Sequence, residues 1–403
     1  MLAAAALLIC VRMPDVVIEG RFWAEEGTVF FHNALVLPAW QAVWNPIGGY
    51  LNLVANVASL LARWTLPVEW APYLTIATGL LFQLLPPALL VTARDPWLHP
   101  RWARATGVLL VILVPASEEI WLQTLHCQFQ LTLCGGIILA LAPVAGPMRG
   151  LRLLLLALGP LCGPGAVVLL PLFAIRWLLD RTWGRAAECG VLGAACAVQM
   201  LVFYTPFPGR EFGLHPTIML AVMSLRHLVE PFLGIRATDS AAAVLRATIA
   251  RGRHPLVSMA APVLLFGALA LAALRTGGLR APGLWLLAAG LASLAAGFFG
   301  ALGGAIQLLD AHLGGRYIYV PQALLSLSLL SVATTAAWPV RVVAAPLIVW
   351  LLVMGAYSYP NTWSVIAHGP AWRPGVAAWR ADPSRPVPIW PEGWELRVPA
   401  SGS

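Results

Sequence analysis

The chain has 403 residues, of which 60% are hydrophobic and only 10% are charged, and its mean hydropathy is +0.79. Soluble domains carry about 25% charged residues, so this composition excludes a soluble protein of the same length. The net charge of +8 comes from arginines scattered between apolar runs, whereas a protein that binds nucleic acid needs a clustered basic face.

Long apolar runs recur from one end of the chain to the other, many of them close to the roughly 20 residues that cross a hydrocarbon core. Only helices and closed barrels satisfy every backbone polar group in lipid, and continuous rather than alternating runs favour helices. The sequence predicts an all-α, polytopic transmembrane helix bundle of about eleven spans (ten to twelve). The expected spans are 1–13, 70–92, 104–117, 127–145, 151–162, 164–180, 186–204, 255–274, 283–303, 317–336 and 342–357.

The first loop, 14–69, is expected outside the membrane, with residues 49–63 lying as a helix at the interface. Its stretch "GRFWAEEGTVFF" holds Glu25 and Glu26 between large apolar side chains. A carboxylate partly withdrawn from water is a better proton acceptor, which suits a general base for an acceptor hydroxyl. The alternative is a solvated first turn of a helix, where acids favour the helix dipole. Adjacent helical residues point about 100° apart, so only one of the two acids can enter a given cavity.

The arginines set the expected orientation, because short cytoplasmic loops carry an excess of basic residues. With the first loop outside, loop 93–104 lies inside, together with Arg149, Arg152, Arg176, Arg181, Arg185, Arg275, Arg280 and Arg341. This scheme makes 205–254 a long external loop with amphipathic helices, although its own basic residues argue against that side. The membrane domain covers 1–357, and an external tail, 358–403, rich in Trp and Pro, caps the face that holds Glu25 and Glu26.

Further polar residues collect on the same expected side, and ionisable groups near membrane depth usually face a cavity or a partner. Three later segments supply them: Glu118, Glu119, His126, Gln128 and Gln130 after the third span, Arg210 and His215 in the long loop, and Asp310, His312, Arg316 and Tyr317 after the ninth. The amides and His126 are either donors to a sugar or headgroup, or interhelical hydrogen bonds.

Arg316, in "GGRYIY", lies at the mouth of a span behind two glycines. An arginine in that position can hold a phosphate through two parallel hydrogen bonds. Alternatively, it anchors the helix at the interface, or it forms a local charge network with Asp310 and His312. No HExxH spacing occurs, so we predict no zinc site.

The layout of the first 65 residues resembles the type C glycosyltransferases, and "WAEEG…GGYL" with the later "PEGW" also resembles bacterial integral membrane proteins of this type. The shared pattern is one span, the acidic motif, a short helix, an aromatic turn with "NPIGGYL" and another apolar helix. The resemblance implies an enzyme of the bacterial plasma membrane whose active face is extracytoplasmic. Its donor would be a polyprenyl-phosphate sugar and its acceptor a hydroxyl of a saccharide, lipid or protein.

The resemblance also implies roles for particular residues. Glu25 or Glu26 would deprotonate the acceptor, and Arg316 would hold the departing phosphate. A single base suits inversion of configuration, because retaining enzymes generally need a second, nucleophilic carboxylate. A divalent cation could assist, but the sequence assigns it no ligands and implies no other cofactor.

Two other functions stay open. A transporter or flippase of lipid-linked saccharides would place charges along a path through the bilayer; Arg12 and the Gly/Pro break at 159–165 fit that reading. A membrane-bound acyltransferase would need a buried histidine paired with an acid or amide, and His126 is its candidate.

Overall fold

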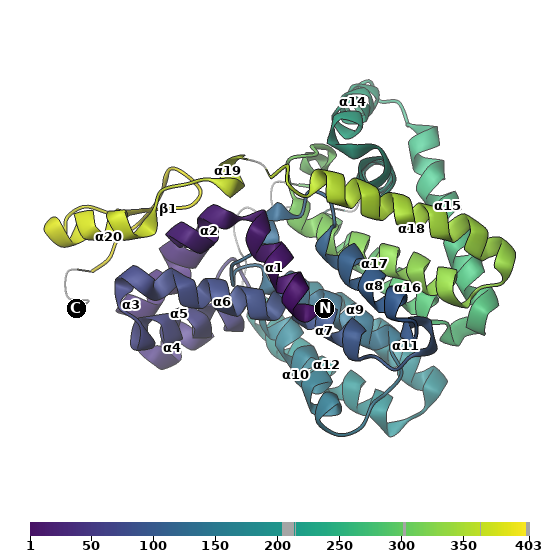
Figure 1. Ribbon diagram of the computed structural model, residues 1–403, viewed down its shortest axis with the longest axis horizontal. Helices are drawn as coiled ribbons and strands as arrows, with labels where there is room; N and C mark the ends of the chain where they lie inside the picture. The colour runs from purple at the N-terminus through teal and green to yellow at the C-terminus, as the bar shows by residue number, and fades with distance from the viewer. Residues whose placement is uncertain (204–212, 214, 301–303, 363, 400–403) are drawn as a thin grey trace.

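The computed structural model describes residues 1–203, 213, 215–300, 304–362 and 364–399. These residues form a helix bundle with a smaller arm at one end, and the arm contains both the first loop and the C-terminal segment (Figure 1). The predicted all-α, polytopic helix bundle is confirmed, and several helices are apolar enough for an integral membrane protein.

The first 65 residues form short helices because prolines and a glycine interrupt them. Pro14 opens a new helix directly after the first, and Gly20 ends that helix with a φ of +71°. The elements are α1 (Leu2–Arg12), α2 (Pro14–Glu19), the π-helix η1 (Glu26–Phe31), α3 (His32–Val36), α4 (Ala39–Trp44) and α5 (Leu53–Thr65).

The next segment crosses the bundle repeatedly. Its elements are η2 (Val68–Trp70), α6 (Ala71–Gln83), α7 (Leu85–Thr92), η3 (Pro96–Leu98), α8 (Arg101–Ile112), η4 (Glu118–Ile120), α9 (Cys127–Ala140), α10 (Pro147–Leu161), η5 (Pro164–Leu169), α11 (Leu170–Asp180) and α12 (Trp183–Phe203). The break between α10 and α11 brings Gly163 against α9. A Cβ atom on Gly163 would lie 1.9 Å from Gln128 Oε1, so only glycine permits this approach.

The second half of the bundle contains its longest helices. They are α13 (Pro216–Ser224), the π-helix η6 (Leu225–Val229), α14 (Glu230–Ala250), α15 (Leu256–Gly277), η7 (Gly278–Arg280), α16 (Pro282–Phe299), η8 (Ala305–Leu309), α17 (Gly315–Thr335) and α18 (Trp338–Ser358). Residues 205–254, expected to be a long external loop with amphipathic helices, form α13, η6 and α14 in their described part. That stretch is itself long and apolar enough for a span.

The C-terminal segment folds onto the first loop. It contains α19 (Ser364–Ala367), α20 (Trp372–Ala381), β1 (Val387–Ile389) and β2 (Trp394–Leu396), and the two strands pair antiparallel with Ile389 opposite Trp394. Phe22 of the first loop stacks on Phe31 at 4.6 Å between ring centroids and meets the Trp372 ring edge-on at 5.1 Å. The arm is therefore one packed unit made from the two ends of the described chain.

The core of the bundle surrounds α9 and α17. In the apolar window of α17, 78% of the residues are buried, against 11% in α15 and 22% in α18. The outer faces of α15 and α18 instead expose apolar side chains such as Leu264 and Val343. A soluble protein rarely leaves such contiguous apolar surface exposed, whereas lipid covers it without cost.

The predicted number of spans is not supported. Among the described residues, seven helices have the length and apolarity to cross a membrane, or eight if the pair α10 and α11, bent by 118°, counts as one. The expected spans 1–13, 104–117 and 127–145 correspond to helices of only 11, 12 and 14 residues. These helices are shorter than the expected spans because the apolar residues at their ends lie in turns and loops.

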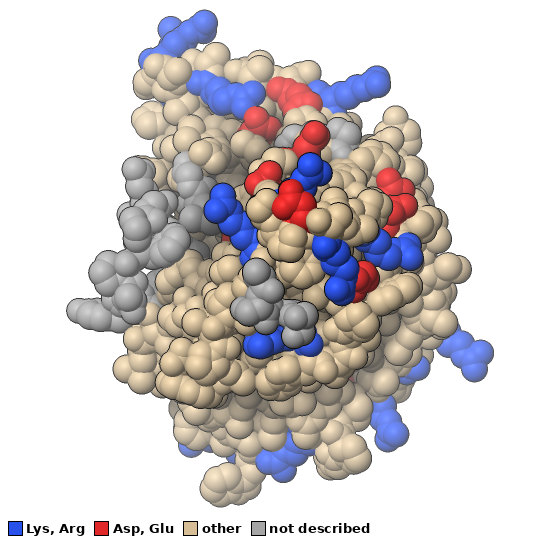
Figure 2. Space-filling model, turned by 90° about the vertical axis from the view of Figure 1, so that its left-hand side faces the viewer, with Lys and Arg blue, Asp and Glu red and all other residues tan. Residues whose placement is uncertain are grey.

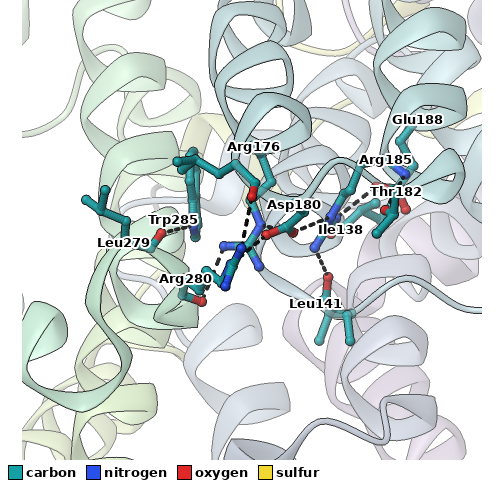
Figure 3. A network of polar contacts seen from close by, with 12 residues as sticks. Ile138, Leu141, Arg176, Asp180, Thr182, Arg185, Glu188, Leu279, Arg280 and Trp285 are labelled. Carbon is teal, nitrogen blue, oxygen red and sulfur yellow. Dashed lines mark hydrogen bonds and ion pairs between the residues drawn. The ribbon is translucent and has the colours of Figure 1, made fainter.

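A charge cluster centred on Asp180 joins three helices at one end of the bundle (Figure 3). Asp180 Oδ2 lies 2.8 Å from Arg176 Nε and 3.3 Å from Arg185 Nε, and Oδ1 accepts a hydrogen bond from Arg280 Nε at 3.2 Å. Arg185 Nη1 also pairs with Glu188 at 2.8 Å. Buried charges of this kind are tolerated only when they are paired.

The same end collects the arginines that the sequence places in cytoplasmic loops, and we call it the basic end. Arg185 donates to the Leu141 carbonyl and Arg152 to that of Ala142, whose N–H is bound by Asp95. Loops that follow α7, α9 and α11 therefore meet at one end of the bundle.

We expect Asp180→Asn to lower the free energy of unfolding by about 2–3 kcal/mol, because it weakens several hydrogen bonds to charged groups and leaves arginines without their anion. Thermal or denaturant unfolding of the purified protein measures the change. Asp382→Asn is the matched control, since the Asp382–Arg385 pair is exposed. Equal stability of the two variants would contradict a structural role for the cluster.

Candidate functional site

A pocket of about 270 Å³ lies at the end of the bundle opposite the basic end, beneath the arm. Four segments line it: the first loop through Trp23, the loop after α8, the loop before α17, and the C-terminal segment through Ile366 and Pro391. Five residues expected at the site line it together, namely Glu118, Glu119, His312, Arg316 and Tyr317. Figure 2, which views the molecule from the side of the arm, shows acidic and basic side chains interspersed on this side.

Glu119 and Arg316 form an ion pair across the pocket, with Arg316 Nη1 donating to Glu119 Oε1. Their side chains are 17% and 25% exposed, so the pair borders the open space. The Arg316 guanidinium also lies over the Tyr317 ring, 5.1 Å from its centroid. The pocket thus holds a carboxylate from the loop after α8 and a guanidinium from the start of α17, and their charges neutralise one another.

Glu118 faces α1. Its Oε2 lies 3.5 Å from Arg12 Nη2, and Arg12 Nη1 donates to Ser117 Oγ at 3.4 Å. The Arg12 guanidinium packs over the Tyr359 ring at 4.5 Å. Arg12 therefore lies at the end of a helix beside the pocket and not in the middle of a transport path.

The loops on either side of the pocket approach each other through a glycine at the start of α17. A Cβ atom on Gly315 would lie 2.0 Å from the Ala116 carbonyl oxygen. This contact explains why residue 315 is a glycine. The φ of +66° at Gly314 explains the other glycine, because glycine adopts this conformation without a steric penalty. The close approach brings Arg316 within reach of Glu119.

Arg21 fixes the C-terminal segment beside the pocket. It is 1% exposed and donates to the carbonyl oxygens of Trp121 at 2.9 Å and Ile366 at 3.1 Å. Its guanidinium lies between two indole rings, 4.9 Å from Trp23 and 5.1 Å from Trp390. Burial lowers the pKa of Arg21 to about 10, which leaves it charged at neutral pH. The Arg21 side chain therefore links three segments that line the pocket: the first loop, the loop after α8 and the C-terminal segment.

Glu26, one of the two expected catalytic acids, is fully buried and serves as a hydrogen-bond acceptor. Oε1 accepts from Thr124 N at 2.7 Å and from Thr124 Oγ1 at 2.5 Å, and Oε2 accepts from Trp23 N at 3.3 Å. Burial raises the pKa of Glu26, while the bonds from Thr124 and the charge of Arg21 oppose this shift. Both oxygens are occupied, so this carboxylate is not available to a substrate in the structure.

Glu25 precedes η1 and is partly buried, and it is absent from the described lining of the pocket. The structure therefore brings neither acid of the pair to the pocket wall; Trp23, two residues earlier, reaches the wall instead. The expectation that the pair lines the cavity needs this correction, because the chain turns at Ala24, with a φ of +43°, before Glu25.

Three expected ligands have protein partners instead. Gln130 accepts a hydrogen bond from the Tyr319 hydroxyl at 3.0 Å, and Gln128 donates to the Tyr50 hydroxyl at 3.3 Å. His126 Nδ1 lies 3.1 Å from the carbonyl oxygen of Glu119, and burial lowers the pKa of His126 to about 4. Of these contacts, only that of Gln130 joins two helices, α9 and α17; Gln128 binds Tyr50 in the first loop, and His126 lies against a backbone carbonyl.

Asp310 and His312 belong to a charge network that ties the loop before α17 to α14. Arg226 Nη1 donates to the Asp310 carbonyl at 2.7 Å, and Arg226 Nε pairs with Glu230 at 2.8 Å. His312 Nε2 lies 3.5 Å from Asp239 Oδ2. The local network expected here is present, but its partners come from α14 and η6 rather than from Arg316.

The remaining expected residues lie elsewhere. His215 is exposed at the start of α13 and does not line the pocket, and Arg210 lies outside the described residues. Within the described chain, no group of three or more His, Cys, Asp or Glu side chains is placed to hold a metal ion.

Sequence reasoning missed the pocket residues of the C-terminal segment, Ile366 and Pro391, and the positioning role of Arg21 and Thr124. The density of Trp and Pro in the tail was the available signal for the first pair. The sequence held no signal for Thr124, because a single threonine in a loop does not indicate a partner 98 residues away.

Comparison with protein families, curated proteins and solved structures finds no match for this chain. The functional argument therefore depends on the geometry of the pocket.

The raised pKa of Glu26 predicts a pH effect on stability. Because the folded protein binds this proton more tightly than the unfolded chain, the free energy of unfolding should fall as the pH rises above the ordinary value of 4.5. Glu26→Gln should flatten this slope by up to about 1.4 kcal/mol per pH unit. Unfolding midpoints between pH 4 and 8 measure it.

Asp382→Asn is the control for this series, because bonds from Ser384 lower the pKa of Asp382, opposite to the shift of Glu26. An unchanged slope in Glu26→Gln would show that the pKa of Glu26 is the same in the folded protein and in the unfolded chain.

Proposed function

We propose that this chain is a glycosyltransferase of the bacterial plasma membrane. It transfers a sugar from a polyprenyl-phosphate donor to an acceptor hydroxyl on the extracytoplasmic side. The observation that carries the proposal is the pocket at the end of an apolar bundle, where Glu118, Glu119 and Arg316 meet. A cation for a phosphate and carboxylates for a hydroxyl proton lie together where a lipid-borne substrate arrives from between helices.

The charge distribution supports the orientation. Arginines concentrate in the loops of the basic end, and short cytoplasmic loops carry such an excess. The pocket lies at the opposite end, where Glu118 and Glu119 line it beside Arg316. An extracytoplasmic pocket suits a donor carried on a lipid, because nucleotide sugars are not needed there.

Within this proposal the chain runs between the two ends eleven times, although only seven or eight of the described helices have the length and apolarity of a span. α8 leads from the basic end to the pocket and α9 leads back, as the Glu118 and Leu141 contacts indicate, although each is shorter than an ordinary span. α15 must begin on the pocket side, because its other end joins the basic end through Arg280. Under this scheme α13 and α14 stay on the pocket side, and η8 contacts both.

The transfer needs one base and one stabilised leaving group. A pocket carboxylate, Glu118 or Glu119, takes the proton of the acceptor hydroxyl as its oxygen attacks the anomeric carbon. The bond from that carbon to the phosphate oxygen breaks, and polyprenyl phosphate leaves with the electron pair. Arg316 stabilises the charge that develops on the phosphate. One displacement inverts the anomeric configuration.

The pocket volume supports a small transferred group. Pockets for drug-sized ligands measure about 300–1,000 Å³, and this one, at about 270 Å³, lies just below that range. It suits the phosphate with a single sugar unit better than a long oligosaccharide. The lipid chain would lie outside, against the apolar helices.

One observation keeps a flippase of lipid-linked saccharides as the second candidate. α10 and α11 form a broken pair bent by 118°, and discontinuous helices often build the binding sites of transporters. Against this, the charges that line the pocket lie at helix ends and in loops, and those of α10 and α11 belong to the basic end.

A transfer assay tests the proposal. Purified protein in lipid discs is given a panel of polyprenyl-phosphate sugars and acceptors, and product is measured by mass spectrometry. Replacing the acting base, through Glu118→Gln or Glu119→Gln, should lower the rate by about 10²–10⁴-fold. Glu69→Gln is the control, because Glu69 pairs with Arg380 on the arm, away from the pocket lining.

Three results would redirect the assignment. A loss confined to Glu25→Gln would return the base to the first loop. Translocation of the lipid-linked sugar in vesicles without bond formation would favour the flippase. Full activity in both pocket variants would remove the carboxylates from the mechanism.

A further inference from the structure

Arg316 is already neutralised in the structure. Along the described lining of the pocket it is the one guanidinium, and its partner is the Glu119 carboxylate. A phosphate that enters the pocket must therefore compete with Glu119 for the same N–H donors. Binding of the donor's phosphate to Arg316 therefore requires release of the Glu119 carboxylate.

The surroundings of Glu119 suit a side chain that moves while its backbone stays. Its carbonyl oxygen accepts from the Gln123 side chain and lies 3.1 Å from His126 Nδ1, which anchors the main chain. Its carboxylate pairs with Arg316, and the side chain borders the pocket with 17% exposure. Rotation of the side chain alone would separate the carboxylate from Arg316.

The start of α17 and a neighbouring ring position Arg316. It begins α17, whose Gly315 contacts the Ala116 carbonyl too closely for any side chain, and its guanidinium rests on the Tyr317 ring. A planar guanidinium accepts a phosphate through two parallel hydrogen bonds. The helix amino terminus adds a favourable field for an anion. The donor's phosphodiester carries one negative charge, as the Glu119 carboxylate does, but its two free oxygens can accept both parallel hydrogen bonds, whereas Glu119 accepts from Nη1 through Oε1.

We propose that Glu119 is a resident competitor for Arg316: the donor's phosphate displaces it, and the freed carboxylate becomes the base that takes the acceptor's proton. This inference rests on the proposed transferase function and makes it ordered, with donor binding before deprotonation. While Arg316 donates to Glu119 Oε1, that oxygen is engaged, and its release leaves both carboxylate oxygens for the acceptor's proton. In this exchange the phosphate replaces the Glu119 carboxylate as the ion-pair partner of Arg316, and no covalent bond is broken.

Phosphate binding tests the exchange without any transfer. The full chain in lipid discs is titrated with inorganic phosphate and with geranyl monophosphate, and the dissociation constant is measured by calorimetry. Glu119→Gln removes the competitor's charge, so both probes should bind about two- to fivefold more tightly, the range of a partly exposed ion pair. Arg316→Gln should weaken binding by about tenfold or more.

Glu69→Gln is the matched control, because it removes the acid of another Glu–Arg pair, and its dissociation constants should equal those of the wild type. Glu119→Ala replaces Glu119→Gln if that variant does not fold, since it also frees Arg316. Unchanged or weaker phosphate binding in the Glu119 variant would overturn the exchange.

Activity measurements separate this inference from the function on which it rests. We expect the Glu119→Gln protein to bind the donor more tightly and to have a lower kcat than the wild type. Its KM should therefore not rise. Tighter phosphate binding without transfer by any protein form would reject the transferase and keep the anion exchange. Transfer by the wild type with unchanged phosphate binding in Glu119→Gln would reject the exchange and keep the transferase. Tighter binding with full turnover would reject Glu119 as the base.

Discussion

The buried carboxylate of Glu26 constrains the whole pocket end of the molecule. Its acceptors are satisfied by Thr124 and by the backbone of Trp23, so the first loop cannot move away from the loop after α8 without exposing a charge to an apolar interior. Arg21 lies in the same region, and its charge favours the ionised form of Glu26. Together they set where Trp23, Trp121 and the C-terminal segment stand, and therefore the shape of the pocket.

Composition and apolar runs were sufficient to predict an all-α membrane protein, because a helix in lipid must satisfy its own backbone and needs a long apolar stretch. The convergence of several polar loops also followed from the sequence, since loops after alternate spans return to the same side. Glu118, Glu119, His312, Arg316 and Tyr317 do meet at one pocket. The arginines of the other loops likewise meet at the basic end.

The role of each acid could not be read in the same way. Glu25 and Glu26 are adjacent, and the π-helical turn that begins at Glu26 decides which of them is buried. That turn depends on packing against Thr124 and on the β-strands of the tail, which no local pattern reveals. Helix lengths were overestimated for a related reason, because apolar residues beside α1, α8 and α9 line loops rather than extend the helices.

The two roles of carboxylates at this end of the molecule follow from their access to water. Glu26 has three donors and no exposure, so it acts as a fixed link between segments. Glu119 has an exposed edge and an ionic partner that an incoming anion can take over. The contacts give Glu26 a structural role, and the chemical role of Glu119 is the one that we propose.

The pocket draws its walls from positions as distant as Trp23 and Pro391. A chain inserted into a membrane from its amino terminus contains every long apolar helix before the second of these residues is made. Until then, the indole face of Trp23 and the guanidinium of Arg21 lack the ring of Trp390. A growing chain of this protein therefore contains its bundle helices but an incomplete cavity, and the site takes shape only when the C-terminal segment folds onto the first loop.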